Sequence, residues 1–180
     1  MNNLYILDQV YKLNESVNRM LLDIWMKQIV FSWRWWVEIL LAIIPWILWI
    51  KFRDKKATDR LLFVGLLVFV VTNTLDNIGI AYNAWHYDWN VLPIVPIYLP
   101  WDFTLFPILV MWLLQYKPNI SPLVKALVFS AFNAFLMEPL FQYFSFYHPV
   151  AWKQYYSFII YIPLYLFFNY VSKRKFLENL

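Results

Sequence analysis

The chain has 180 residues, of which 62% are hydrophobic, 22% aromatic and 14% charged. Soluble domains are about 45–50% apolar and about 25% charged, and a small one has too much surface to bury so many aromatic side chains. The composition excludes a soluble globular domain and a disordered chain, and it predicts an integral membrane protein. The net charge of +4 does not indicate nucleic-acid binding, because Lys and Arg fall between long apolar runs.

Residues 3–27 have the pattern of an amphipathic helix rather than of a membrane span. Val10, Val17 and Ile24 recur every seven residues, and the charged residues fall elsewhere on the helical wheel. The charges exclude a crossing of the bilayer. Two interpretations remain open. The helix lies at the membrane interface or on the bundle, or it is a coiled-coil segment that binds a second copy or a partner subunit.

Five further segments are apolar enough to cross a bilayer, which takes a helix of about 20 residues. We interpret them as helices, because an open strand in lipid would leave its backbone polar groups unpaired. Residues 1–180 are therefore expected to form a single all-α membrane domain, a polytopic helical bundle. The predicted spans are residues 35–50, 61–84, 101–116, 122–143 and 154–171.

The distribution of Lys and Arg predicts the orientation of these spans. Five spans place segment 51–60, segment 117–125 and the SKRK tail on one side, and these contain ten Lys and Arg residues. The other side carries Arg34 and Lys153 near the spans, and Arg19 and Lys27 in the N-terminal helix. We expect a multi-pass protein of a bacterial cell membrane with its C-terminus in the cytoplasm.

Four acidic residues lie within the predicted spans, where ionisable groups are costly and are functional candidates by default. The alternating direction of the spans places all four in the outer third of the membrane, so a compact bundle would bring them to one pocket. They are Glu38, Asp76, Asp102 and Glu138. Glu138 continues the small-residue series Ala126, Ser130 and Ala134, which predicts a packed helix face.

Each acid also has a structural interpretation. Asp102 follows Pro100 at a helix start, where an acid complements the positive end of the helix dipole. Glu38 could pair with Arg34, four residues earlier, at the headgroup level. Asp76 and Glu138 could be protonated or hydrogen-bonded groups of the packed bundle.

Buried acids can bind a cation, relay a proton or protonate a substrate. The candidate catalytic residues are Asp76, Asp102 and Glu138. The candidate binding residues are Glu38, Asn73, Trp85, Tyr87, Trp101 and Asn133. The proline-rich loop 85–100 is expected to be neither helix nor central strand. It would form a lid over the acids or a short connector resting on headgroups.

Cysteine is absent and only two His residues occur, His86 and His148. These facts exclude a disulfide framework and a thiolate metal site, and two His residues cannot form a His-rich metal site alone. A site that combines the acids with a His is chemically possible. No close ligand spacing supports it, so we expect no bound metal and no cofactor.

Several stretches resemble an uncharacterised family of small multi-pass membrane proteins of spore-forming Gram-positive bacteria. The resemblance covers nearly the whole chain, and PWDFTLFP is its most specific piece. The matching stretches are FSWRWW (31–36), PWILWIKF (45–52), LDNIG (75–79), PIYLPWDFTLFPILVMWLLQY (96–116), EPLF (138–141) and WKQYYSF (152–158). The family has Gly before its Glu-Pro pair, where this chain has Met137. The resemblance implies that Asp76, Asp102 and Glu138 belong to recurring motifs, but it implies no activity.

The region from Asp76 to Asp102 also resembles the small membrane domain of lycopene cyclases. The shared features are an acid in one helix, a Trp-x-Tyr at Trp85 and Tyr87, and a Leu-Pro-x-acid start to the next helix. Those cyclases protonate the end group of a polyene from a carboxylic acid, without a metal. This chain has Trp101 and Asp102 where that family places paired acids.

The sequence leaves several functions open. The outer-side acidic pocket could bind a membrane lipid or an isoprenoid without chemistry, or it could protonate such a ligand as an enzyme. The same acids could serve a small proton- or cation-linked transporter. A fourth alternative is an assembly subunit that docks through its N-terminal helix.

Overall fold

The computed structural model describes residues 3–93 and 97–174. It is mostly helical, as predicted, with 78% of residues in helices. The helical and strand elements are α1 (Asn3–Ile24), η1 (Trp25–Ile29), α2 (Trp33–Phe52), η2 (Lys55–Ala57), α3 (Thr58–Ala81), β1 (Trp85–Tyr87), η3 (Pro100–Leu105), α4 (Phe106–Gln115), α5 (Pro122–Phe132), η4 (Asn133–Met137), α6 (Glu138–Tyr143), β2 (Tyr147–Pro149) and α7 (Gln154–Ser172).

Three helical stretches are long and apolar enough to cross a membrane: Trp33–Phe52, Lys55–Ala81 and Pro122–Tyr143. Helices also occupy the positions of the other two predicted spans, at 100–115 and 154–172. The first of these is shorter than a typical span, and the second is rich in Tyr. The predicted count of five spans is therefore not confirmed by length and hydropathy.

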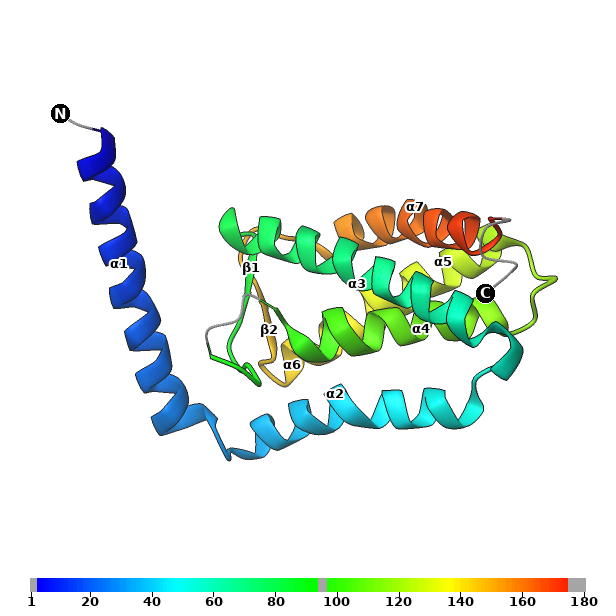
Figure 1. The fold of residues 1–180 in the computed structure, drawn as a ribbon, viewed down its shortest axis with the longest axis horizontal. Helices are drawn as coiled ribbons and strands as arrows, with labels where there is room; N and C mark the ends of the chain where they lie inside the picture. Colours follow the sequence, from blue (N-terminus) through cyan, green and yellow to red (C-terminus); the bar gives the residue numbers. More distant parts are fainter. Residues whose placement is uncertain (1–2, 94–96, 175–180) are drawn as a thin grey trace.

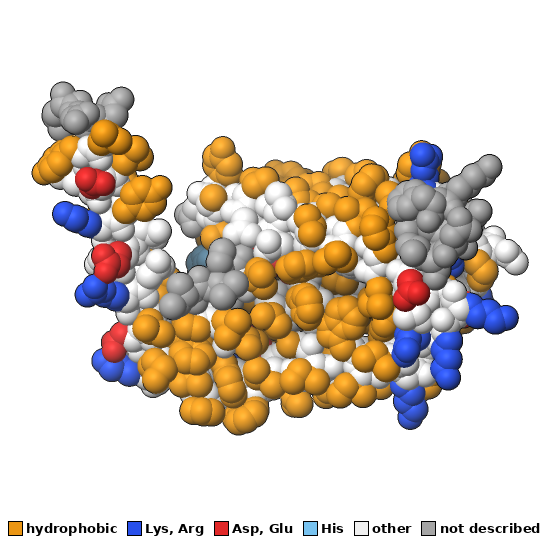
Figure 2. All heavy atoms as spheres, viewed as in Figure 1, with side chains coloured by type: hydrophobic (Ala, Val, Ile, Leu, Met, Phe, Trp, Pro, Cys, Tyr) orange, Lys and Arg blue, Asp and Glu red, His pale blue; other side chains and the backbone are white. Residues whose placement is uncertain are grey.

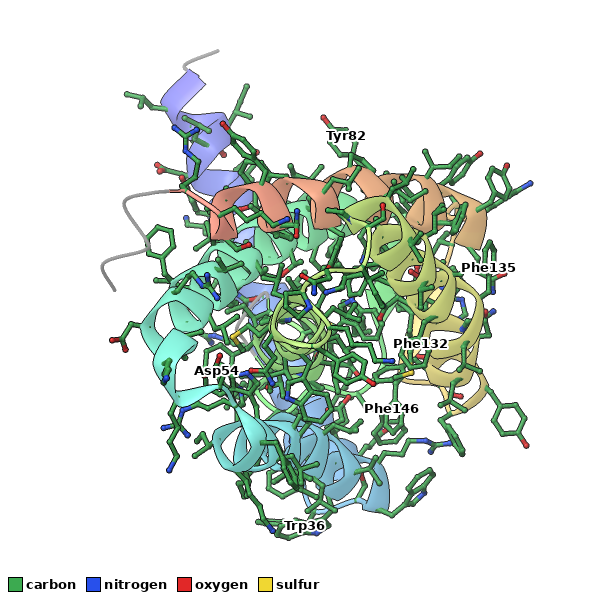
Figure 3. All side chains as sticks on the ribbon, turned by 90° about the vertical axis from the view of Figure 1, so that its right-hand side faces the viewer. Trp36, Asp54, Tyr82, Phe132, Phe135 and Phe146 are labelled. Carbon is green, nitrogen blue, oxygen red and sulfur yellow. The ribbon has the colours of Figure 1, made fainter. Side chains whose placement is uncertain are left out.

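The helices from α2 to α7 form one bundle with α4 at its centre. α2, α3, α5 and α7 surround α4 in the view along the bundle (Figure 3). α4 is buried accordingly: Phe106, Val110 and Met111 have at most 1% of their surface exposed. Trp36, Tyr82 and Phe135 point outward, as the surface of a bundle that faces lipid would require (Figure 3).

α1 lies outside the bundle and runs across the direction of the bundle helices (Figure 1). Its Lys, Arg, Asp and Glu side chains lie along the edge that faces away from the bundle (Figure 2). Arg19 binds Glu15 and Lys27 binds Asp23, each pair one helical turn apart. The helix therefore does not pack on the bundle, and its direction suits a helix that lies flat at a membrane surface.

Two of the helices widen into π-helical turns that end two residues before a proline. η3 precedes Pro107 and η4 precedes Pro139. A proline ring collides with the carbonyl of the residue four positions earlier in an α-helix and cannot donate a backbone hydrogen bond. In the wider turn the Phe106 N–H bonds the carbonyl of Trp101, five residues earlier. Asp102 lies within the first of these turns, and Glu138 directly follows the second.

At one end of the bundle, a two-stranded ribbon joins the connection between α3 and η3 to the connection between α6 and α7. The sequence does not predict this ribbon. β1 pairs with β2 in antiparallel fashion, with His86 opposite His148 and Tyr87 opposite Tyr147. β1 takes up the first residues of the loop 85–100, before its prolines, so they do not interrupt the strand. Residues 94–96 of this loop lie outside the described residues.

The opposite end of the bundle carries the basic residues. The Lys and Arg side chains near the α2–α3 connection and the end of α7 gather there, next to an apolar surface (Figure 2). Lys175, which belongs to the basic tail, lies outside the described residues. The basic residues and the ribbon thus lie at opposite ends of the bundle. That the basic end faces the cytoplasm stays a prediction.

Single cysteines distinguish five spans from three, because the chain has no native Cys. Five spans place Asn119, between α4 and α5, on the same side as Lys56, and Val150, after β2, on the other. We expect a membrane-impermeant maleimide to label Val150→Cys in intact bacterial cells. Asn119→Cys and Lys56→Cys should react only after permeabilisation.

Three spans would reverse the positions of Asn119 and Val150 and leave that of Lys56 unchanged. Labelling of Asn119→Cys but not Val150→Cys in intact cells would therefore contradict the five-span arrangement.

Candidate functional site

A pocket lies at the ribbon end of the bundle, between α3, α7 and the ribbon, with a cavity volume of about 190 Å³. Three of the four predicted acids line it: Asp76 from α3, Asp102 from η3 and Glu138 from α6. Each is at most 7% exposed. The structure therefore brings together acids from three separate helical segments, in one place and at one end of the bundle.

Asp76 is held by the ribbon. One carboxylate oxygen, Oδ1, accepts hydrogen bonds from Trp85 Nε1 and from the Tyr87 hydroxyl, each at 2.7 Å. Burial raises the pKa of the Tyr87 hydroxyl well above its ordinary value, and the nearby Asp76 and Asp102 charges raise it further. Tyr87 therefore stays protonated and acts as a donor. The predicted binding residues Trp85 and Tyr87 thus line the pocket and hold the Asp76 carboxylate in place.

Gly79 makes room for the Trp85 indole. A Cβ atom at this position would lie 2.1 Å from two carbons of the Trp85 ring. Gly79 is one turn of α3 beyond Asp76 and on the same face. The absence of a side chain there lets the indole lie close to the helix and reach the carboxylate.

Asp102 approaches Asp76 from the centre of the bundle. It is 1% exposed, and the carboxyl groups of the two acids are neighbours. Its backbone carbonyl accepts a bond of 3.5 Å from the Thr72 hydroxyl of α3, which ties the wide turn η3 to that helix. Trp101, the predicted binding residue directly before Asp102, also lines the pocket.

Glu138 enters the pocket from the other side. Its Oε1 accepts a hydrogen bond of 2.8 Å from the Tyr161 hydroxyl of α7. The predicted small-residue face leads to it: Ala126, Ser130 and Ala134 each have 0% of their surface exposed. These small side chains let α5 approach its neighbour closely, which places Glu138 at the pocket wall.

Glu38 is buried but does not line the pocket. Its exposed fraction is 0%, and its carboxyl group lies next to the hydroxyl of Tyr98, which does line the pocket. Pairing with Arg34 at the surface is wrong. Arg34 instead donates to the carbonyl of Phe144 at 3.1 Å and lies over the rings of Trp33 and Trp89.

The two predicted amide residues lie away from the cavity. Asn73 accepts hydrogen bonds from the Asn77 side chain at its backbone carbonyl and at its Oδ1. Asn133 is fully buried and donates to the carbonyl of Phe129 at 2.7 Å. Both residues therefore make hydrogen bonds one helical turn along their own helix, as polar side chains in helices often do.

Sequence reasoning missed several polar and aromatic residues of the pocket. Ser157 and Tyr161 come from α7, and Trp152 donates to the Ser157 hydroxyl at 2.8 Å. Ser157 and Tyr161 lie four residues apart in the predicted span, and this spacing was the available signal for an inward face. Tyr98 also lines the pocket and stacks on Tyr87 with ring centroids 3.9 Å apart.

One oxygen of each pocket acid has no hydrogen-bond partner among the described residues: Asp76 Oδ2, Asp102 Oδ2 and Glu138 Oε2. Unpaired buried polar atoms are costly, and they often mark places where a ligand or water binds. Within the described parts of the chain, these acids are not grouped closely enough to hold a metal ion. The arrangement can donate protons or hydrogen bonds to a ligand between aromatic walls.

Comparisons with known proteins add no assignment. No family model, no curated protein and no solved structure matches this chain.

Gly79→Ala should disrupt the bond between Trp85 and Asp76, because the added methyl group would occupy the position of the indole. We expect a loss of about 1–3 kcal/mol, the usual cost of overpacking a core. A lower thermal unfolding midpoint of the protein in detergent would report this loss.

Gly65→Ala is the matched control. A Cβ atom there meets the sulfur of Met111 at 2.7 Å, and that flexible side chain can move away. An equal drop in the unfolding midpoint for both variants would show that the Gly79–Trp85 contact tolerates a methyl group as well as the Gly65–Met111 contact does.

Proposed function

We propose that the chain is a five-span protein of a bacterial cell membrane whose outer-side pocket binds the end of an isoprenoid or similar lipid. The observation that carries this proposal is the wall of the pocket. Leu75 and Ile78 of α3 and Ile160 of α7 line the cavity, yet they are 39%, 50% and 36% exposed. A residue that both lines a cavity and lies on the bundle surface marks its mouth.

The mouth opens sideways between α3 and α7. These two helices lie side by side along the bundle (Figure 1). In a membrane, side chains on this flank face acyl chains rather than water, so a ligand would reach the pocket from within the bilayer. An apolar, chain-like molecule fits this route, whereas a water-soluble substrate does not.

The size of the cavity favours a chain end over a whole ligand. Pockets that enclose a drug-sized molecule measure about 300–1,000 Å³, and this one has a volume of about 190 Å³. One end group of a long isoprenoid would therefore lie against the acids, with the rest of the chain between α3 and α7. Aromatic rings such as Tyr98, Trp101 and Phe141 supply apolar contact for it.

The position of α4 supports five spans. α4 lies inside the ring formed by the other helices (Figure 3), and α7 packs along α5. If the three long apolar helices cross the bilayer, α4 must cross it with them, because the surrounding helices enclose it. α7 shares the same depth, and its exposed side chains include Ile159, Ile160 and Phe167.

A second candidate function is acid-catalysed cyclisation of a polyene end group, favoured by the Asp76 and Asp102 carboxyl groups that line one pocket as neighbours. A carboxyl group buried among apolar side chains beside a second acid can keep its proton. Transfer of that proton to a terminal C=C bond forms a C–H bond and a carbocation. The next double bond closes the ring, and loss of a proton to the carboxylate restores the acid. Aromatic faces stabilise the intermediate cation.

Blocking the mouth tests ligand binding. Ile160→Trp places a large ring where the cavity meets the surface, so we expect about tenfold less lipid or isoprenoid retained after gentle extraction, measured by native mass spectrometry. This factor corresponds to about 1.4 kcal/mol. Ile159→Trp is the control, because Ile159 is 60% exposed and lies outside the pocket. Equal retention by the two variants, or no retained ligand in the native protein, would reject the proposal.

Removing one acid tests the chemistry. Asp102→Asn keeps the shape of the side chain but cannot act as a carboxylic acid, so cyclisation of a linear polyene with isoprenoid ends should slow by about 10²–10⁴-fold. Ligand retention should stay within about twofold of the native protein. Asp59→Asn, in the first turn of α3 at the basic end, should cyclise at the native rate. Unchanged turnover in Asp102→Asn would exclude it as the proton donor.

A further inference from the structure

The ribbon carries a group of metal-binding side chains outside the pocket. His86 of β1 lies directly opposite His148 of β2, and their rings stack with centroids 4.6 Å apart. Asp88 follows β1 two residues after His86, and its Oδ1 lies 3.2 Å from His86 Nε2. The sequence shows no close ligand spacing here, because only the strand pairing brings the two His residues together.

Strand alternation separates this group from the acid pocket. Successive side chains of a strand point to opposite faces. Trp85 and Tyr87 of β1 and Tyr147 of β2 therefore face the cavity, and all three line it. His86 and His148 point the other way and are exposed, as is Asp88.

We propose that His86, Asp88 and His148 bind one divalent transition-metal ion, with Zn²⁺ as the best match. Two imidazole nitrogens and one carboxylate oxygen form a ligand set that zinc accepts, and a water molecule would complete a tetrahedron. Mg²⁺ and Ca²⁺ prefer ligands that are all oxygen, so the His pair disfavours them.

The distances allow this coordination after small rotations of the side chains. One ligand atom from each residue can be chosen so that all three lie within 4.8 Å of one another. Two nitrogens on one tetrahedral zinc ion lie about 3.3 Å apart, as follows from bonds of about 2.0–2.1 Å. His86 and Asp88 keep 48% and 35% of their side-chain surface exposed, which leaves room for the rotations that close this difference.

A metal ion here would fasten the two strands that hold the pocket together. β1 supplies the donors to Asp76, and β2 supplies Tyr147 to the cavity wall. A bond from each strand to one ion restricts their separation. The ion would therefore stabilise the folded ribbon, and more so the more tightly it binds, because it binds the folded state preferentially. This proposal does not depend on what occupies the pocket.

The test uses the full chain in detergent, purified through a tag without His, and titrated with Zn²⁺ in a calorimeter. We expect one Zn²⁺ per chain and a higher thermal unfolding midpoint with saturating metal. His148→Gln and Asp88→Asn should each weaken Zn²⁺ binding by at least about tenfold and remove most of the rise in midpoint. Both residues are exposed, so the variants should fold as the native protein does.

Asp59→Asn is the matched control for binding to an exposed carboxylate elsewhere, and it should bind Zn²⁺ as the native chain does. Two results would overturn the proposal. Native-strength binding by His148→Gln would show that the metal lies elsewhere. No saturable binding by the native chain would show that the two His rings only pack against each other.

Discussion

A carboxylate buried in an apolar helical bundle needs hydrogen-bond donors, and this requirement shapes the ribbon end of the molecule. Asp76 lies on α3, and the donors that reach it, Trp85 and Tyr87, come from the strand that follows the helix. Those bonds draw the chain back over the end of the bundle. The strand β2 then pairs with β1, and both strands supply residues to the pocket wall.

The prolines and glycines of the chain make this arrangement possible. A π-helical turn precedes both Pro107 and Pro139, and the pocket acids Asp102 and Glu138 lie in or directly after these turns. Gly79 leaves space for the Trp85 ring. Residues that would weaken an ordinary helix are therefore found where the pocket is built, as is common at sites where a protein binds or reacts.

Hydrophobic patterning predicts most of the helices and part of the site. The series from Ala126 to Glu138 indicates a packed face, and the structure buries all of it. Asp76 and Asp102 also reach the pocket, as their depths in the spans suggest. These features follow from the helical repeat and from the cost of charge in lipid, and both can be read from one segment at a time.

The remaining features depend on contacts between distant segments. Nothing near Glu38 in the sequence shows that Tyr98 lies beside it or that Arg34 turns away to the carbonyl of Phe144. The ribbon is a second example. A three-residue strand has no pattern of its own, and its partner is far along the chain. Pairing of this kind is decided by the three-dimensional fold, so single segments cannot reveal it.

The central claim is that the acids of three helical segments share a pocket reached from the bilayer between α3 and α7. A prenyl chain that carries a photoactivatable diazirine at its end, added to the protein in lipid nanodiscs, tests this most directly. Mass spectrometry of the labelled peptides should place the adducts on the mouth residues Ile78 and Ile160 and on the acids Asp76 and Glu138. Adducts confined to outward-facing side chains such as Ile159 and Phe135, with none on the acids, would contradict the account.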